Sequence, residues 1–246
     1  TKDISGLYFA GQLNGTSGYE EAAAQGLVAG ANAALKLNNK APLFLERSNS
    51  YIGVLIDDLI TKDINEPYRM FTSRAEHRLF LRTDNAVLRL LNLAGKHNLI
   101  THAQKKLYVD FKNSVNNIKR VCSENKIINN NKHISISLYL KRPENNIYDS
   151  LISKFLPAKA SKKALFTAET DIKYEGYVNI EKQRIKKIRG LESMALPLNL
   201  NYSLIRGLSA ESQEKLLKIK PETLGQASRI SGVRPSDISI LSIYLQ

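Results

Sequence analysis

The sequence predicts a mainly α-helical protein that opens with one strand–turn–helix unit. From about residue 84 onward, apolar side chains recur every three or four positions, which is the period of an amphipathic helix. Near the start, the run ISGLYFAG at 4–11 has the composition of a short buried strand, and a polar turn with two glycines follows at 12–18. A helix then begins at Tyr19, with two glutamates and three alanines in its first turns.

Composition excludes several classes of protein. The chain has 246 residues, of which 43% are hydrophobic, so it can bury a core and is not a disordered basic tail. Its length fits one large domain or two smaller ones. The single cysteine, Cys122, excludes an internal disulfide and a cysteine-based zinc site, and it fits a reducing compartment such as the cytoplasm. No apolar run reaches the roughly 18 residues of a membrane helix, and no signal peptide is recognisable.

The charge and the first residue also carry information. The chain has 36 Lys and Arg against 23 Asp and Glu, a formal net charge of +13, which favours a polyanionic partner such as nucleic acid. The chain is also rich in Lys, Asn and Ile, and such a composition would give a similar charge without any partner. Because the first residue is Thr1 and not Met, we expect the chain to begin inside a longer polypeptide.

The turn after the predicted strand is a candidate ligand site. Strand, glycine turn and helix N-terminus together direct backbone N–H groups toward an electron-rich ligand. Small residues on one stripe of the following helix would let it pack closely on a sheet or a cofactor. An ordinary strand–turn–helix unit without a ligand remains the alternative. The candidate residues are Gly11, Gln12, Asn14, Gly15, Thr16, Ser17 and Gly18.

Four arginines, Arg69, Arg74, Arg78 and Arg82, lie within fourteen residues of one another. Whether the segment is a helix or a strand, the spacing places at least two of them on one face. Arginine suits bidentate contact with phosphate or carboxylate, so the cluster is a candidate RNA-binding surface. The alternative is that these arginines pair within the protein with Asp57, Asp58, Glu66, Glu76 and Asp84.

The remaining segments give weaker predictions. Thr101 is expected to cap a long helix whose apolar stripe includes Cys122 and whose outer face carries lysines, interpreted as a solvated face in preference to a phosphate-binding one. Residues 133–138 allow a short strand, and 157–170, with Lys159, Lys162 and Lys163, are interpreted as a connecting loop. The four histidines lack ligand spacing, so no metal site is predicted. The stretch 227–245 resembles a helix-turn-helix with Gly232 in its turn, but the second helix, expected at 236–245, lacks base-reading side chains.

Several continuous stretches carry a family resemblance. The run GLYFAGQLNGTSGYEEAAAQGLVAG at 6–30, the block NEPYRMFTSRAE at 65–76, and the segments KYEGY at 173–177 and TLGQASRISGV at 223–233 resemble the MnmG/GidA family of tRNA uridine 5-carboxymethylaminomethyl modification enzymes. The matched blocks bracket nearly the whole chain, although about 125–170 aligns poorly. At His77 the family typically has tyrosine.

The resemblance implies the C-terminal portion of an enzyme that uses FAD and NADH and acts with the GTPase MnmE on carbon 5 of the tRNA wobble uridine. It implies a homodimer in the full-length family, no membrane association, FAD contacts from residues 11–18, and tRNA contacts from the four arginines. No catalytic residue is assigned here, and Cys122 does not replace the family's catalytic cysteines. Because no GxGxxG occurs, we expect this chain alone to be inactive and not to hold FAD tightly.

The implied fold is a strand–turn–helix remnant of an FAD-binding α/β domain followed by a largely helical region. The expected segments are 1–46, the end of the FAD-binding domain; 47–100, an arginine-rich linking region; 101–172, a helical region; and 173–246, a C-terminal helical subdomain for tRNA or partner binding. A stand-alone RNA-binding or adaptor module is the alternative from another functional class. Isolated from its sheet, the segment 1–36 is expected to be locally unstable.

Overall fold

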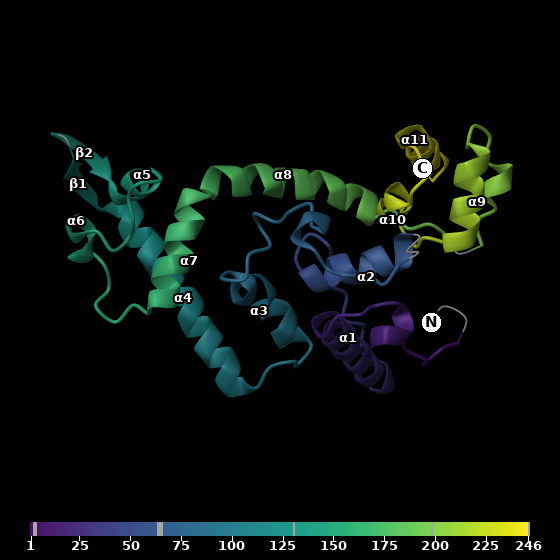
Figure 1. The fold of residues 1–246 in the computed structure, drawn as a ribbon, viewed down its shortest axis with the longest axis horizontal. Helices are drawn as coiled ribbons and strands as arrows, with labels where there is room; N and C mark the ends of the chain where they lie inside the picture. Colours follow the sequence, from purple (N-terminus) through teal and green to yellow (C-terminus); the bar gives the residue numbers. More distant parts are fainter. Residues whose placement is uncertain (2–3, 63–65, 130, 198, 246) are drawn as a thin grey trace. The chain divides into compact units, whose positions relative to one another are not determined.

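The computed structural model describes residues 1–246 apart from 2–3, 63–65, 130, 198 and 246, and over these residues the protein is mainly helical, as predicted (Figure 1). The backbone contacts divide the chain into two compact units. The composite unit combines residues 1–76 and 182–246, and the inserted unit is residues 77–181. This division differs from the four expected segments, which remain a prediction.

The composite unit is built from short helices that come from both ends of the chain. From the first part come η1 (Gly11–Asn14), α1 (Tyr19–Leu37), α2 (Tyr51–Thr61) and η2 (Thr72–Arg74). The last part contributes η3 (Tyr202–Leu204), α9 (Ala210–Ile219), α10 (Leu224–Arg229) and α11 (Pro235–Tyr244). The final helices enclose their own apolar core, in which Leu216, Leu224 and Leu241 are fully buried.

The strand predicted at 4–11 is not formed, and this prediction is wrong. Residues 7–10 are irregular, and the 3₁₀ helix η1 starts at Gly11. A strand needs a hydrogen-bonded neighbour, and no described segment pairs with these residues. Tyr8 and Phe9 therefore remain partly exposed, at 37% and 43% of their surface. Phe9 satisfies its carbonyl locally, by accepting a hydrogen bond from Asn14 Nδ2 at 3.0 Å.

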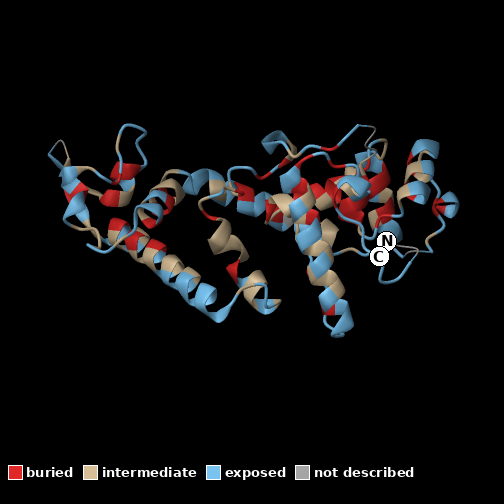
Figure 2. Ribbon diagram, turned by 60° about the horizontal axis from the view of Figure 1, so that its bottom comes forward, coloured by how far each residue is buried: buried red, intermediate tan, exposed pale blue. Residues whose placement is uncertain are grey.

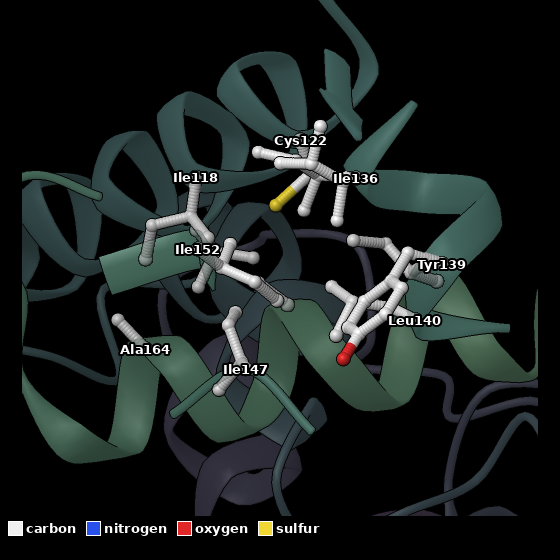
Figure 3. Packing of buried hydrophobic residues seen from close by; sticks show 12 residues of the cluster. Ile118, Cys122, Ile136, Tyr139, Leu140, Ile147, Ile152 and Ala164 are labelled. Carbon is white, nitrogen blue, oxygen red and sulfur yellow. The ribbon is translucent and has the colours of Figure 1, made fainter. Parts of the chain in front are cut away.

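The inserted unit packs several helices around an aliphatic core. Its elements are α3 (Ala86–Lys96), α4 (His102–Glu124), the hairpin β1 (Lys126–Asn129) with β2 (Lys132–Ser135), α5 (Ile136–Leu140), α6 (Ser150–Ser153) and α7 (Lys162–Lys173). Figure 3 shows Ile118, Ile136, Leu140 and Ile152 converging in the core, where each is fully buried. The long helix α8 (Glu175–Glu192) starts in the inserted unit and ends in the composite unit.

Two details of the inserted unit agree with the sequence predictions. Thr101 caps α4, because its Oγ1 accepts the Gln104 N–H at 3.2 Å while Gln104 Oε1 accepts the Thr101 N–H at 2.9 Å. Cys122 is fully buried in the core, and its burial raises the pKa of the thiol to about 11. Cys122 therefore packs as a small apolar side chain.

Two other predictions need correction here. Only 133–135 of the stretch 133–138 form a strand, because Ser135 caps α5 and the chain turns helical at Ile136. The region interpreted as a loop contains α7, whose first turn is capped by Ser161 Oγ. Ala164, Ala168 and Ile172 are buried and form the inner face of α7. Figure 2 colours the ribbon by burial, with buried residues in red.

Candidate functional site

Gln25 holds the predicted ligand-binding turn in shape from a buried position on α1. Its side-chain Oε1 accepts hydrogen bonds from the Gly11 N–H at 3.1 Å and from Asn14 Nδ2 at 2.8 Å. Its Nε2 donates to Thr16 Oγ1 at 2.9 Å. One amide thus fixes three points of a six-residue turn. Gly11 and Gly15 adopt φ values of +78° and +76°, a region that favours glycine.

The turn borders a cavity of about 440 Å³ in the composite unit. A Cβ placed on Gly15 would meet nothing within 4 Å, so the glycine leaves its side of the turn open. Five of the seven candidate residues line this cavity, whereas Gly11 and Gly18 do not. The five are Gln12, Asn14, Gly15, Thr16 and Ser17, and the lining is completed by Leu59 of α2 and by Lys62, Glu66 and Pro67, which follow that helix.

Gly18 has a different role. It precedes α1, and a Cβ there would collide with the carboxylate of Glu21, which is 2% exposed. Glu21 Oε1 accepts the Met70 N–H at 2.8 Å, and this bond joins the start of α1 to the arginine-rich segment. A carboxylate at a helix N-terminus offsets the positive end of the helix dipole. The cavity therefore depends on the donors of the turn itself more than on the helix terminus.

The turn is tied to α2 through Tyr68. The Tyr68 N–H donates to the Gly15 carbonyl at 2.7 Å, and its hydroxyl donates to Asp58 Oδ2 at 2.9 Å. Asp58 is fully buried and also receives Arg47 Nη1 at 2.6 Å and Lys62 Nζ at 2.8 Å. Burial would raise the pKa of Asp58, but the bonds from Lys62, Arg47 and Tyr68 hold that pKa below its usual value. Burial and Asp58 together raise the pKa of Tyr68.

Arg47 is the central cation of this network. Its Nη2 contacts Glu76 Oε1 at 2.6 Å, and its Nη1 reaches Asp57 Oδ2 at 3.1 Å in addition to Asp58. Burial would lower the pKa of Arg47, but Glu76 and Asp58 outweigh it and the pKa is raised. Asp57 in turn receives Nε and Nη2 of Arg229 from α10, both at 2.7 Å. The C-terminal helices are thereby joined to α2 by a bidentate ion pair.

The four predicted arginines occupy different surroundings. The segment that holds them is neither a helix nor a strand, but the short η2 followed by successive turns, so both predicted geometries are wrong. The unit boundary falls between Glu76 and His77, which assigns Arg69 and Arg74 to the composite unit and the other two to the inserted unit. In the composite unit, Arg69 Nη2 contacts Glu20 at 3.2 Å, and the Arg74 guanidinium stacks 4.5 Å from the Tyr68 ring centre.

In the inserted unit, Arg82 pairs with Asp84 at 2.9 Å and with Asp171 at 2.6 Å. The predicted alternative of internal pairing therefore holds for Arg82 with Asp84, and the 3.9 Å approach of Arg74 to Asp58 is a weaker instance of it. Arg78 is exposed, and no described residue forms an ion pair with it. His77 is buried against Glu181, with Nδ1 and Oε2 2.6 Å apart.

Two segments of the chain match models of known protein families. Residues 184–246 match the family model described as the tRNA modifying enzyme MnmG/GidA C-terminal helical bundle, and residues 1–41 match the model for glucose inhibited division protein A. The chain belongs to the MnmG/GidA family. It is 48% identical over 253 aligned positions to the MnmG of Borrelia garinii subsp. bavariensis and 44% identical over 272 to that of Enterococcus faecalis.

Each alignment covers nearly the whole chain, 99% and 100%, but only 41% and 42% of the relative. The chain thus spans less than half the length of these curated relatives. Among solved structures, Aquifex aeolicus GidA in its form II crystal matches the chain over its full length with a TM-score of 0.88 and 40% identity, again covering 41% of that protein. Residues 1–246 thus correspond to the C-terminal portion of the family.

Three groups at the site were not identified from the sequence: Gln25, Arg47 and Arg229. Gln25 gave one usable signal, because it is the only polar uncharged residue inside the small-residue run from Ala22 to Gly30. A polar residue on a closely packed stripe needs a hydrogen-bond partner. Arg47 and Arg229 gave no such signal, because their partners lie 10 to 172 positions away along the chain.

Among the described residues, no helix combines the length and the apolar character that a membrane-spanning segment needs.

Proposed function

We propose that this chain supplies the turn side of an FAD site and part of the tRNA-binding surface in an enzyme that modifies the wobble uridine of tRNA. The MnmG/GidA family is an FAD-dependent enzyme family. The observation that carries the proposal is the cavity beside Gly15, where a glycine wall without a side chain meets polar groups fixed by one buried amide. These features fit a flat heteroaromatic ring with polar edges.

Gln12 and Asn14–Ser17 would hold the flavin, which when bound supplies the electron-transfer chemistry. The chain's own residues orient the flavin and exclude water from it. Gln25 keeps the Asn14 amide directed into the turn, and Tyr68 anchors the Gly15 carbonyl, so neither group has to reorganise when a ligand arrives. Leu59 and Pro67 provide apolar walls. Arg69 and Arg78 are the arginines of the cluster with the most accessible guanidinium groups, and we assign them to tRNA phosphates.

The family resemblance adds NADH, an MnmE-like GTPase, a homodimeric assembly and a cytoplasmic location to this proposal. The product would carry a carboxymethylaminomethyl group at carbon 5 of the uridine. A stand-alone RNA-binding module is the second candidate, and the concentration of lysines in the inserted unit favours it over a DNA-binding helix-turn-helix. In α11, Ile238 and Leu241 are buried in the C-terminal core and cannot enter a groove of DNA.

The proposal is tested by reconstitution. The chain is mixed with FAD alone, and with FAD plus the separately produced preceding portion of the Borrelia relative. We expect flavin absorbance to co-elute with protein only in the second mixture, and Gln25→Leu to reduce the bound flavin at least tenfold. Gly30→Ala, on the same helix but away from the cavity, is the control that should bind as the parent chain does. No flavin in the mixture, or equal flavin with Gln25→Leu, contradicts the assignment.

A further inference from the structure

Most of the positive charge of the chain lies in the inserted unit. Residues 77–181 contain 18 Lys and Arg residues against 9 Asp and Glu, a formal charge of +9. The composite unit has 18 Lys and Arg residues against 14 Asp and Glu, a charge of +4, although it is the longer of the two. The inserted unit therefore carries about two thirds of the net charge on fewer residues, and its electrostatic potential is the more positive.

Many of the inserted unit's cations are not neutralised within the protein. Among the described residues, no ion pair is formed by a group of lysines on α4, on α7 and just before α7. Asp110 is the only acidic residue between His102 and Ser123, and α7 has no acidic residue in its first turn. A first turn normally favours carboxylates. The lysines of this group are Lys105, Lys106, Lys112, Lys159, Lys162 and Lys163.

The packing of α4 on α7 brings part of this group together. The Lys163 ammonium lies 5.4 Å from the ring centre of Phe111, and Lys119 Nζ contacts Asp171 at 3.1 Å. Both contacts advance in the same chain direction along α4 and α7, which cross at an angle in Figure 1. Lys105 and Lys112 precede Lys119 by two and by one heptad, and therefore share its edge of α4.

The two ends of this edge differ in charge balance. At the C-terminal end, Asp171 neutralises Lys119 and also pairs with Arg82. At the N-terminal end, Asp110 is the only carboxylate on α4 before Glu124, and no described residue forms an ion pair with the lysines of α4 or with those that open α7. We name the set Lys105, Lys112, Lys162 and Lys163 the lysine seam. Its members are exposed except Lys112, which is half-buried beside Phe111.

We propose that the lysine seam binds the sugar-phosphate backbone of a folded RNA, which under the proposed function is the tRNA substrate. Lysine is a mobile point charge suited to phosphate contacts that do not read sequence. The seam therefore supplies binding strength, whereas the nucleotide to be modified would be recognised elsewhere. A lipid surface fits less well, because the apolar face of α4, with Val115, Ile118 and Cys122, is already buried in the core and cannot insert into a bilayer.

The test is a salt-dependent titration of the full chain. A fluorescently labelled tRNA transcript with uridine at the wobble position is titrated between 50 and 200 mM KCl, and anisotropy gives the dissociation constant. The seam variant combines Lys105→Gln, Lys112→Gln and Lys162→Gln. The control variant removes the same charge at exposed lysines outside the seam that form no ion pair with any described residue, with Lys40→Gln, Lys126→Gln and Lys132→Gln. Matching circular dichroism spectra and melting temperatures establish that both variants fold.

We expect the seam variant to bind tRNA at least tenfold more weakly at 150 mM KCl and to lower the slope of log K against log salt by about 2–3. The control variant should change the affinity less than threefold. Equal losses in both variants, or no loss in the seam variant, overturn the proposal. So does seam-dependent binding to vesicles with 30% anionic lipid in the absence of tRNA binding. FAD reconstitution is expected to be unchanged by the seam variant, so a failed titration with intact flavin binding rejects the seam and leaves the flavin assignment standing.

Discussion

The composite unit and the inserted unit each contain 18 Lys and Arg residues, but they use them differently. In the composite unit, Arg47 and Arg229 are largely buried and each contacts at least two carboxylates, so their charges fix the packing of helices from both ends of the chain. In the inserted unit, lysines stay on the surface and aliphatic residues form the core. Arginine forms the buried ion pairs that fix helix packing, whereas lysine provides accessible positive charge on the surface.

The largest effect is expected at the centre of the composite unit's ionic network. Asp58→Ala leaves Arg47, Lys62 and the Tyr68 hydroxyl without their shared partner in a buried site. We expect the free energy of unfolding of the composite unit to fall by about 3–5 kcal/mol, measured by urea denaturation. Glu124→Ala, which breaks the exposed pair with Arg120, is the control and should cost less than about 1 kcal/mol. Equal losses of unfolding free energy in the two variants would contradict the distinction between buried, paired charges and exposed ones.

The inserted unit should instead be most sensitive to loss of aliphatic packing. Ile118 is fully buried between α4 and its neighbours, as Figure 3 shows, so Ile118→Ala removes buried surface and leaves a cavity. We expect a loss of about 3 kcal/mol, with hydrogen exchange accelerated in α4 and α7. Exchange in α2 and α10 should not change, because those helices belong to the composite unit. Faster exchange throughout both units would contradict their independence.

Acidification should remove the stabilising contribution of another buried carboxylate of the composite unit, that of Asp237. Burial would raise the pKa of Asp237, but hydrogen bonds from Ser212 and from the Ser209 and Arg234 N–H groups hold that pKa at about 2, below the ordinary value of an aspartate. A lowered folded-state pKa stabilises the protein above the unfolded pKa, and this stabilisation is lost as pH falls through the folded pKa. We therefore expect the stability gap between the parent chain and Asp237→Asn to be constant above about pH 4.

Below about pH 4 that gap should shrink by about 2 kcal/mol as the pH approaches 2. Urea midpoints of both proteins, collected from pH 2 to 7, measure the change directly. A gap that is independent of pH would show that Asp237 does not gain its charge-stabilising hydrogen bonds in solution.

The smallest expected effect on stability is local. Gln25→Leu removes the acceptor of the Gly11 N–H and of the Asn14 amide, and it should cost about 1–3 kcal/mol. Hydrogen exchange at Gly11 should accelerate far more than exchange in α2. Gln25→Glu retains the acceptors, and Thr16 can donate to it, so the turn should be rescued in part. Equal exchange at Gly11 in all three proteins would show that another group holds the turn.

The sequence predicted those parts of the fold that depend on local signals. The cap at Thr101 and the apolar stripe that includes Cys122 predicted α4, because both signals lie within the helix or next to it. The strand at 4–11 was wrong because a strand exists only with a partner that the local pattern does not reveal. Helix α7 was missed because Ala164, Thr167 and Ala168 form its buried face, and such small residues produce a weak hydrophobic period.

For the same reason, the turn of the candidate site could be predicted from the sequence, but the surroundings of its arginines could not. Gln12 and the turn residues from Asn14 to Ser17 line the cavity, and Gly15 marks the left-handed backbone conformation of the turn directly. The arginine cluster did not reveal which of its members would be taken up by ion pairs. Asp171, which engages Arg82, lies 89 positions along the chain, so the assignment required the tertiary fold.

The most direct test of the division between displayed and structural charge is a lysine footprint. The full chain is acylated briefly with an amine-reactive reagent, with and without the tRNA transcript, and the modification of each lysine is measured by mass spectrometry. We expect tRNA to protect Lys105, Lys162 and Lys163 strongly and to leave Lys40, Lys126 and Lys132 unchanged. Protection of the second set with continued reactivity of the first would contradict the assignment of RNA binding to the lysine seam.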